Sequence, residues 1–386
     1  MYLKPRMGCS AVPLKMVSSD GSSIHSPFTQ YHIFLVAAEV VRHCPTCIWA
    51  GRLLPSSPPV DRVWRSYANV SKAKRPQEDF HQMAFESCPL CQGTDTRDVG
   101  KPRVGSAIRK TEQSHTADSV RVLECRSCHY YYCSPFISFS PEDFEILYDN
   151  EYFGQPTEQY ANRSRVSVPT RNLQRLESLC TRDVHDFLEI GCGEGYALEA
   201  AQNKRWRSVG VGVTPAYAES VSKRLGVQVL IGQFQELALP EESFDIIYVN
   251  SVLEHVTDPE GFLRECWRVL RPGGMAFFLV PNEDALINDF RHIIYRLMGR
   301  NTASRLDPFR NPYHIQGFSP FSLRLLFERA NFNITSLEVT SGTNEIGKFK
   351  LGSCKKLAFQ LALYPVYWLG ERIGRGTSLV TIVTWG

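Results

Sequence analysis

The chain has 386 residues, 43% of them hydrophobic, so it can bury a full-sized core, and its length favours either two domains or one large domain with an appendage. Its 43 Lys and Arg residues against 40 Asp and Glu residues leave a net charge of only +3, which predicts no basic groove for nucleic acid. The apolar run at 357–369 is too short to span a bilayer and contains Pro365, so we expect no transmembrane helix.

Residues 1–82 are rich in proline and serine and have no sustained hydrophobic periodicity, which predicts a poorly ordered leader. A linker or arm, a transit peptide and a natural start at Met83 remain open for this segment. No signal-peptide pattern is expected, because the first apolar stretch begins only at Tyr31. The 12 cysteines are therefore expected in a reduced, cytoplasmic setting rather than in disulfides.

Two CxxC pairs follow the leader. Cys88 and Cys91 form the first pair, and Cys125 and Cys128 form the second. Each pair lets two thiolates converge on one cation, and four thiolates close the tetrahedral shell that zinc prefers, with no position left for substrate. The sequence predicts a structural Zn²⁺ site in a zinc-ribbon-like segment at 83–140. Four free thiols in a degenerate ribbon remain the alternative, because the gap between the pairs is longer than in compact ribbons.

The run FLEIGCGEGYALEA combines a strand pattern, a glycine turn and a helical pattern. We expect a buried strand at 185–190 and a helix at 196–203, with Gly191, Gly193 and Gly195 in the turn between them. Backbone amides at a helix start then face whatever lies above the strand end. This arrangement predicts a nucleotide-like ligand.

The spacing of the glycines separates two such ligands. A dinucleotide fingerprint requires GxGxxG, whereas Tyr196 stands here in the place of the third glycine and would obstruct close packing of helix on strand. S-adenosylmethionine instead brings an ammonium and a sulfonium to the loop. Glu189, just before the turn, is well placed to order the loop and to attract that ammonium. S-adenosylmethionine is therefore favoured over a nicotinamide dinucleotide.

Apolar strands and helices alternate along the rest of the chain. A helix at 260–270 is expected to end at Pro272, with a turn at 271–274. This pattern predicts an α/β fold whose mostly parallel sheet is wound on both faces by helices. The expected strands after the glycine loop lie at 207–213, 227–232, within 244–256, and at 275–282, 332–340 and 377–385.

Together these segments resemble the class I S-adenosylmethionine-dependent methyltransferases, especially the ubiquinone-biosynthesis branch. The resemblance rests on LEIGCGEG, SFDIIYVNSVLEHVTDP, LRPGG and HIQGFSP, which match over about 180–340, and with the ribbon-bearing members described next it covers roughly 85–386. Members with a CxxC...CxxC ribbon and a YxxxYF segment are similar too, and this chain has YDNEYF at 148–153. The resemblance implies a Rossmann-like, seven-stranded sheet with the last strand antiparallel between the fifth and sixth. It places a methyltransferase domain at 181–386, after a helical linker or substrate cap at 141–180.

The resemblance also implies a set of cofactor-binding residues, with two departures. Gly212 aligns with the acid that usually holds the ribose hydroxyls. Gln233 aligns with the acid near the adenine amine, and its amide oxygen can still accept that hydrogen bond. Phe234 could pack either on the purine or in the core. The expected set is Glu189, Gly191, Cys192, Gly193, Gly195, Gln233, Phe234 and Asn250.

Two histidines are candidate catalytic residues. His255 follows the fourth expected strand at its carboxyl end, where open α/β sheets bind ligands, and its titration range suits a general base. Glu254 and His255 could instead only cap the turn. His314 is the second candidate, since the resemblance places HIQGFSP beside the substrate pocket.

We therefore expect methyl transfer to a small-molecule, sugar or lipid-linked acceptor. A noncatalytic zinc-ribbon scaffold and, less favoured, an NAD-dependent oxidoreductase are the alternatives. Residues 353–369, rich in Leu, Tyr and Trp, predict a lid over an apolar substrate, a surface that contacts membrane lipid, or an ordinary helix packed on the sheet.

Overall fold

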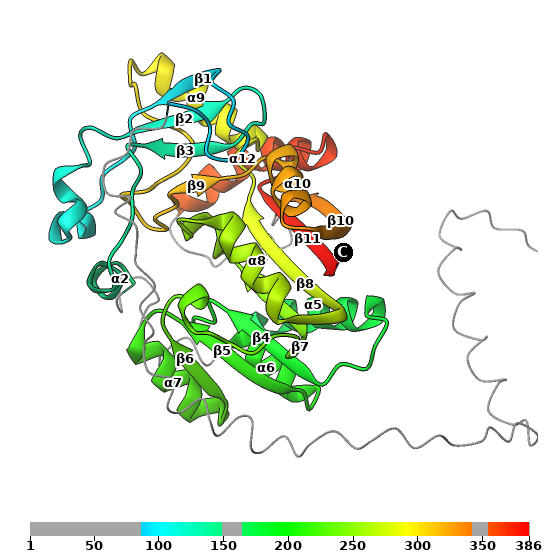
Figure 1. The fold of residues 1–386 in the computed structure, drawn as a ribbon. Coiled ribbons are helices and arrows are strands. Elements are labelled where there is room, and N and C mark those ends of the chain that lie inside the picture. Colours follow the sequence, from blue (N-terminus) through cyan, green and yellow to red (C-terminus); the bar gives the residue numbers. More distant parts are fainter. Residues whose placement is uncertain (1–85, 149–163, 342–353, 386) are drawn as a thin grey trace, which may run out of the picture. The chain divides into compact units, whose positions relative to one another are not determined.

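The computed structural model describes residues 86–148, 164–341 and 354–385. The leader expected at 1–82 and residues 149–153 of the YDNEYF segment lie outside these residues. The described part contains a seven-stranded sheet with helices packed on it and a smaller, four-stranded sheet (Figure 1).

The larger sheet has the strand order β10-β11-β8-β7-β4-β5-β6. Its first five strands in the chain are mutually parallel, whereas the last strand lies antiparallel between β8 and β10. This order confirms the expected seven-stranded, mostly parallel sheet. The strands are β4 (Asp186–Ile190), β5 (Arg207–Gly212), β6 (Gln228–Ile231), β7 (Phe244–Asn250), β8 (Leu270–Pro281), β10 (Phe332–Thr340) and β11 (Ser378–Trp385).

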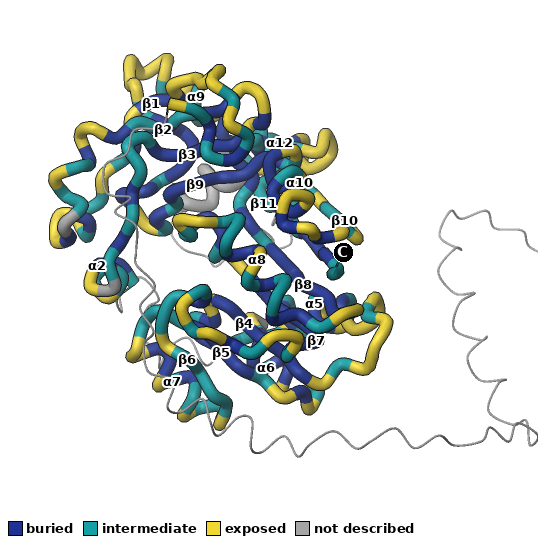
Figure 2. Tube along the Cα trace, in the orientation of Figure 1, coloured by how far each residue is buried: buried dark blue, intermediate teal, exposed yellow. Residues whose placement is uncertain are grey.

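Helices cover both faces of this sheet. Those on one face share a core with inward side chains such as Phe187 and Tyr248, and on the other face Phe278 packs against Phe327 at a ring-centroid distance of 4.9 Å. All residues of β4 are buried, as expected of a parallel sheet that is covered on both sides (Figure 2). The first face has α5 (Ser164–Leu179), α6 (Tyr196–Asn203) and α7 (Pro215–Leu225), and the second has α8 (Pro259–Val269) and α10 (Pro320–Arg329).

The helix before β8 ends earlier than the sequence predicted. α8 stops at Val269, and β8 already begins at Leu270, so the turn expected at 271–274 is part of the strand. Leu270 pairs with Phe244, and the register then shifts by an irregularity before Ile246 pairs with Met275. The prediction of a helix to 270 was wrong because cross-strand pairing, which the local pattern does not contain, extends the strand through the Arg-Pro-Gly-Gly segment.

The four-stranded sheet combines the cysteine-bearing segment with a strand from much later in the chain. Its order is β1-β2-β3-β9. β1 (Thr96–Gly100), β2 (Arg121–Cys125) and β3 (Tyr131–Ser134) come from the expected ribbon, with short 3-10 helices η2 (Ala107–Lys110) and η3 (Glu112–His115) between β1 and β2. β9 (Gln316–Gly317) comes from HIQGFSP and pairs with β3.

The core beside this sheet also draws on both parts of the chain. Ile108, Val122 and Tyr131 pack in one cluster with Phe309 and Ile315. The cysteine-bearing segment therefore shares its sheet and its hydrophobic core with residues that follow β8. The cysteine-bearing segment therefore contacts the part of the chain after β8 both by side-chain packing and by backbone pairing.

Residues 353–369 fall largely in α12 (Cys354–Arg372), which packs against α9 (Leu286–Leu297). Of the three interpretations given above, the helix is therefore present, and it contacts another helix. Within the described residues, no helix has both the length and the apolar character that crossing a bilayer requires.

Candidate functional site

A cleft of about 320 Å³ lies at the carboxyl ends of the parallel strands. Loops after β4, β5, β6 and β7 form its walls, which is where open α/β sheets bind ligands. Seven of the residues expected in the site line it together: Gly191, Cys192, Gly193, Gln233, Phe234, Asn250 and His255.

The glycine loop has the backbone geometry that its sequence requires. Gly191, Gly193 and Gly195 have φ angles of 71°, 46° and 73°, a region that favours glycine. A Cβ on Gly191 would lie 2.3 Å from Val252, and a Cβ on Gly195 would lie 2.6 Å from Val221. Gly191 and Gly193 line the cleft, whereas Gly195 is the N-cap of α6 and packs on α7.

Glu189 lies beneath the loop and is not among the described residues that line the cleft. Its Oε2 accepts a hydrogen bond from the backbone N–H of Leu198 at 2.9 Å. Burial raises the pKa of Glu189 to about 8. The carboxyl group thus ties β4 to the first turn of α6, which is the loop-ordering role; its attraction for a ligand ammonium stays a prediction.

At the end of β5, Gly212 stands where related methyltransferases are expected to have an acid that holds the ribose hydroxyls, and there is room for such a side chain. Gly212 lines the cleft, and a Cβ built on it would meet Cys192 Sγ at 3.6 Å, an ordinary van der Waals distance. Gly212 does not have a positive φ, so a side chain can be accommodated there without backbone strain.

Gln233 and Phe234 form the wall after β6, where Phe234 opens the short helix η4 (Phe234–Glu236). Phe234 is buried, and its ring packs edge-on against Phe262 at a centroid distance of 5.3 Å. Both rings line the cleft. Phe234 therefore belongs to the core and to the cleft wall at once, so the two roles that the sequence left open are compatible.

His255 lies in η5 (Leu253–His255), directly after β7, and faces the cleft. Its Nδ1 lies 3.2 Å from the carbonyl oxygen of Tyr313 and 3.1 Å from the hydroxyl of Tyr148. Because a carbonyl can only accept, a hydrogen bond to Tyr313 places the proton on Nδ1 and leaves Nε2 able to accept a proton. Burial lowers the pKa of His255 to about 4, so the ring is neutral at neutral pH.

His314 lies beside His255, with 5.0 Å between the ring centroids, but it lines a second cavity. Its Nε2 is 3.7 Å from Oε1 of Glu254. Glu254 is 1% exposed, and neither carboxyl oxygen has a hydrogen-bond partner among the described residues. Burial raises the pKa of Glu254 to about 8 and lowers the pKa of His314.

One nitrogen from each histidine and one oxygen of Glu254 lie within 4.8 Å of one another. Two imidazoles and a carboxylate are donors that suit a divalent transition metal. A metal bound to Nε2 of His255 would occupy the lone pair that a general base uses to accept a proton. His255 could therefore not bind a metal through Nε2 and act as a general base at the same time.

The second cavity has a volume of about 220 Å³ and lies at the end of β8, against the first turns of α9. Its lining is mixed. The apolar residues Pro281, Ala285, Ile287, Leu306 and Pro312 contribute to it, and the polar lining includes Asn282, Glu283, Asn288, Arg291, Ser304, Thr377 and His314. Ser304 Oγ and Arg291 Nε are buried without a hydrogen-bond partner in the described residues. Burial raises the pKa of Glu283 to about 7. The cavity therefore offers donors and acceptors to a polar group held near His314.

Sequence reasoning missed the residues that close the cleft opposite the sheet. Ser138, Phe139, Phe144 and Tyr148 line it from the segment around α2 (Pro141–Leu147), which begins with a Ser140 capping box. A substrate cap was expected over 141–180, but no side chains were named. The available signal was the presence of three aromatic residues before, within and after one short helix.

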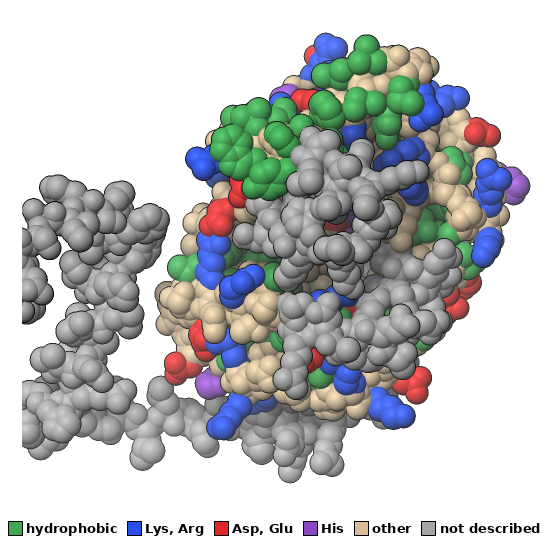
Figure 3. Space-filling model, turned by 180° about the vertical axis from the view of Figure 1, so that it is seen from behind, with side chains coloured by type: hydrophobic (Ala, Val, Ile, Leu, Met, Phe, Trp, Pro, Cys, Tyr) green, Lys and Arg blue, Asp and Glu red, His purple; other side chains and the backbone are tan. Residues whose placement is uncertain are grey.

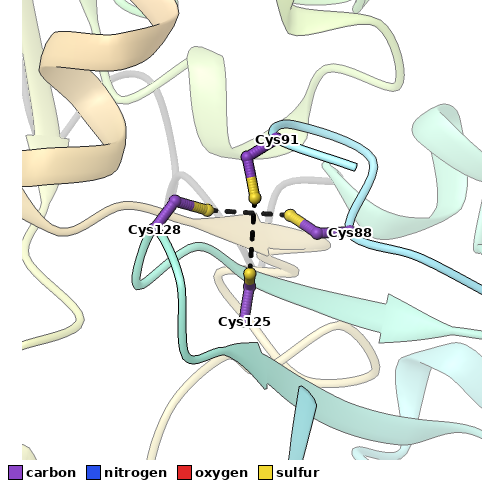
Figure 4. Close-up of side chains that lie close together, drawn as sticks. All are labelled: Cys88, Cys91, Cys125 and Cys128. Atoms are coloured by element: carbon purple, nitrogen blue, oxygen red, sulfur yellow. Dashed lines mark hydrogen bonds between the residues drawn. The ribbon is translucent and has the colours of Figure 1, made fainter. Parts of the chain in front are cut away.

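The four paired cysteines converge on one point (Figure 4). Cys88 Sγ lies 3.7 Å from Cys128 Sγ, and Cys91 Sγ lies 3.5 Å from Cys125 Sγ. Sulfur atoms around a tetrahedral zinc with bonds of roughly 2.3 Å are about 3.8 Å apart. The donor set and its dimensions therefore fit zinc. The long gap between the pairs is filled by β1, η2, η3 and β2, which fold back so that the two pairs meet.

Comparison with known proteins gives one family match. Residues 188–278 match the model of a methyltransferase domain family. This match covers the glycine loop, the cleft walls after β5 and β6, the turn η5 and most of β8. The resemblance inferred from the sequence motifs is thus confirmed over these residues.

Several curated proteins are similar over part of their length. A Mycolicibacterium smegmatis protein named "Probable S-adenosylmethionine-dependent methyltransferase" is 33% identical over 162 residues, which are 42% of this chain and 56% of that protein. A Pseudomonas putida ubiquinone biosynthesis O-methyltransferase is 37% identical over 103 residues, 25% of this chain and 44% of that protein. The chain thus spans about half the length of the curated relatives it matches.

Solved structures give a further likeness. The crystal structure of a SAM-dependent methyltransferase from Archaeoglobus fulgidus is 17% identical, with 62% of this chain and 99% of that chain covered and a TM-score of 0.42.

Proposed function

We propose, since residues 188–278 match the methyltransferase domain family, that this chain transfers a methyl group from S-adenosylmethionine to a small-molecule, sugar or lipid-linked acceptor. The main support is the cleft itself, which brings the glycine loop, the wall at Gln233 and Phe234, and His255 to one edge of the sheet. In this proposal the methionine end of the cofactor lies on Gly191 to Gly193, and the adenine lies beside Phe234.

When bound, S-adenosylmethionine supplies a methyl group that its sulfonium already makes electrophilic. The chain then has to place the acceptor in line with that methyl, and positioning of this kind can lower a barrier by about 7–11 kcal/mol. For a hydroxyl acceptor, Nε2 of His255 would accept the hydroxyl proton and so leave the oxygen able to take the methyl group. The low pKa of His255 keeps this nitrogen unprotonated at neutral pH, but it also makes the ring a weaker base than a histidine in the ordinary titration range expected from the sequence.

The acceptor is proposed to enter between the aromatic cap and the second cavity. Phe144 and Tyr148 line the cleft near His255, and the second cavity, which has several polar lining residues, begins at His314, next to His255. An acceptor with one polar end and one apolar or planar end suits these two environments. His314 is therefore assigned to acceptor binding, and His255 to proton transfer.

The zinc site is proposed to be structural. Cys88, Cys91, Cys125 and Cys128 would fill all four positions of a tetrahedral ion, so no position remains for water or substrate. Metal binding would then stabilise the fold of the four-stranded sheet rather than take part in the chemistry. A cytoplasmic location remains a prediction from the sequence.

The proposal is tested by incubating the purified full chain with S-adenosylmethionine and a panel of hydroxyl, amine and sugar-nucleotide acceptors. Release of S-adenosylhomocysteine that depends on one acceptor class would support methyl transfer and identify the acceptor. Cofactor binding without turnover on any class would favour the noncatalytic scaffold. Binding of a nicotinamide dinucleotide in place of S-adenosylmethionine would favour the oxidoreductase.

Introducing the missing acid gives a second test of the cofactor assignment. Gly212→Asp is expected to tighten S-adenosylmethionine binding about tenfold, because a carboxylate at the end of β5 can accept hydrogen bonds from the two ribose hydroxyls. Isothermal titration calorimetry measures the change, and Gly212→Asn, which lacks the negative charge, is the matched control. Weaker binding in Gly212→Asp than in the unaltered chain would contradict this placement of the ribose.

A lipid-linked acceptor is supported by a surface that α9 and α12 form together. Ile293 and Leu297 on α9 are 57% and 83% exposed, and Met298, directly after α9, is 55% exposed. Trp368 on α12 and Ile373, directly after it, are 47% and 52% exposed. Hydrophobic side chains gather over this end of the molecule (Figure 3). An exposed apolar patch of this kind marks an interaction site.

The charges at this surface suit an anionic membrane. Arg296, Arg300 and Arg372 are exposed beside the apolar residues, and the Arg372 guanidinium lies 5.1 Å from the centroid of the Trp368 ring. Aromatic, aliphatic and arginine side chains in this combination are typical of segments that lie in the headgroup region of a bilayer. We therefore place the apolar end of a lipid-linked acceptor on the side of the molecule that α9 and α12 form.

Vesicle sedimentation tests the membrane contact. The full chain is expected to sediment with vesicles that contain about 30% phosphatidylserine and to remain unbound with pure phosphatidylcholine. Replacing Ile293 and Leu297 together with glutamate should reduce the bound fraction at least tenfold. Leu179→Glu, on the half-exposed end of α5, is the control and should bind as before. If the double variant binds the vesicles as well as the unaltered chain does, the surface formed by α9 and α12 is not the membrane-binding site.

A further inference from the structure

We propose that the cysteine-bearing ribbon holds the catalytic turn in place, with Gln316 as the positioning residue that joins the two. This inference rests on the proposed function, because the turn concerned is η5, which contains His255. It goes beyond that function in giving the ribbon a role in methyl transfer. The argument follows one chain of contacts from the catalytic turn to the metal site.

The contacts begin at the turn. Gln316 is 2% exposed, and its Nε2 donates hydrogen bonds to the carbonyl oxygens of Leu253 and Val256 at 2.7 and 2.6 Å. These two carbonyls flank Glu254 and His255 in the chain. Of the turn's own hydrogen bonds, the one from the N–H of His255 to the carbonyl of Val252 is 2.9 Å, whereas the one from the N–H of Val256 to the carbonyl of Leu253 is long at 3.4 Å. One buried carboxamide therefore fixes both ends of the turn.

The residues just before Gln316 hold the middle of the same turn. The N–H of Ile315 donates to the carbonyl oxygen of Glu254 at 3.1 Å. The carbonyl oxygen of Tyr313 faces Nδ1 of His255 at 3.2 Å and selects the tautomer with a free Nε2. Segment 313–316 therefore sets the turn's backbone as well as the orientation of the proposed base.

The ribbon fixes this segment in turn. β9 pairs with β3, with Gly317 opposite Tyr131 and Gln316 opposite Tyr132. The hydroxyl of Tyr130 donates a hydrogen bond to Oε1 of Gln316, and Tyr130 is 3% exposed. This hydrogen bond decides which way the carboxamide points, since Oε1 faces the donor hydroxyl and Nε2 is left to face the two carbonyls.

Tyr130 is itself part of the metal knuckle. It follows Cys128 by two residues, and its carbonyl oxygen accepts a hydrogen bond from the N–H of Cys125 at 2.9 Å. Its ring stacks on Tyr132 at a centroid distance of 5.9 Å and tilts against Phe318 at 5.6 Å. Closure of the Cys125–Cys128 loop around a metal would therefore fix the hydroxyl that orients Gln316. The ribbon acts on the base through Tyr130 and Gln316, without contacting substrate.

Two variants interrupt this chain of contacts at different points. Gln316→Met removes all three side-chain hydrogen bonds at similar size, and Tyr130→Phe removes only the hydroxyl. Tyr132→Phe is the matched control, because it removes a hydroxyl from the neighbouring ring and leaves the Tyr130–Gln316 hydrogen bond intact. Circular dichroism and zinc content establish that each variant is folded and metal-loaded before comparison.

Amide hydrogen exchange, read by mass spectrometry on the full chain, gives a test that does not need the acceptor. Gln316→Met and Tyr130→Phe are expected to raise exchange at least tenfold in a peptide that covers Leu253–Val256, while exchange in α6 stays unchanged. Tyr132→Phe should behave as the unaltered chain. Unchanged exchange at this turn in both variants, or equal increases throughout the domain, would overturn the proposal.

A second readout separates positioning from general structure. With an acceptor that the unaltered chain methylates, both variants should lower kcat about tenfold. The Kd for S-adenosylmethionine should stay within twofold, because in the proposed function the cofactor lies on a different loop. A change in Kd with kcat preserved would overturn the positioning role. Failure of the unaltered chain to bind S-adenosylmethionine would overturn the proposed function, and the exchange result would still decide whether the ribbon holds the turn.

Discussion

Gly193→Val is expected to weaken S-adenosylmethionine binding at least 100-fold while the domain remains folded. Gly193 lines the cleft, and its φ of 46° is a conformation that a β-branched residue adopts only with strain. The valine side chain would also occupy the space that the methionine end of the cofactor needs. A 100-fold loss corresponds to about 2.7 kcal/mol of binding free energy, which isothermal titration calorimetry measures directly.

Gly226→Val is the matched control for this prediction. Gly226 ends α7 with a φ of 66°, and a Cβ there would meet no atom within 4 Å, so valine introduces similar strain with no ligand to displace. Its affinity for S-adenosylmethionine should stay within threefold of the unaltered chain. Unchanged affinity in Gly193→Val would refute the loop assignment, and equal losses in both variants would show that strain, rather than blocking, is responsible.

His255→Ala should lower kcat for a hydroxyl acceptor by about 10²–10⁴, the usual contribution of a positioned general base. Affinity for S-adenosylmethionine should change little, since the proposal places His255 at the acceptor end of the cleft. His292→Ala, which alters a histidine of α9 outside both cavities, is the control. Steady-state release of S-adenosylhomocysteine gives the comparison. A loss of less than threefold in His255→Ala would leave His255 with only the capping role.

The pH dependence of the rate distinguishes a base from a structural histidine. Burial lowers the pKa of His255 to about 4, so Nε2 is unprotonated through the neutral range. The contribution of this group to the rate should therefore be constant between about pH 6 and 8 and should fall as the pH approaches 4. A rate that rises as the ring becomes protonated would contradict proton acceptance by His255.

The parts of the fold that sequence predicted are those with strong local patterns. The strand expected at 332–340 coincides with β10, and the helix expected at 196–203 coincides with α6. Alternating and helical periodicities arise from burial on one face of an element, so they are readable without tertiary information. The glycine turn was readable for a similar reason, because positive φ angles restrict the residue type.

The parts that sequence could not predict depend on contacts between distant segments. β9 is two residues long and exists only because β3 pairs with it. The Tyr130–Gln316 hydrogen bond joins residues 186 positions apart. Neither residue has a periodicity or motif that indicates its partner. The second cavity was missed for the same reason, since β8, α9 and the loop at 304–314 meet only in the fold.

Some predicted site residues proved to lie outside the cleft for reasons of chemistry. Glu189 satisfies the backbone N–H of Leu198 beneath the glycine loop, because a helix start needs an acceptor. His314 lies next to His255 but faces the second cavity. Sequence order placed both residues near the carboxyl edge of the sheet. It could not decide which side of the loop each side chain occupies.

A crystal structure of the full chain with S-adenosylhomocysteine tests the central claim most directly. The account predicts the methionine end of the ligand on the backbone of Gly191 to Gly193, the adenine against Phe234, and the sulfur directed toward His255. A ligand bound elsewhere, with the loop closed over by side chains, would contradict it.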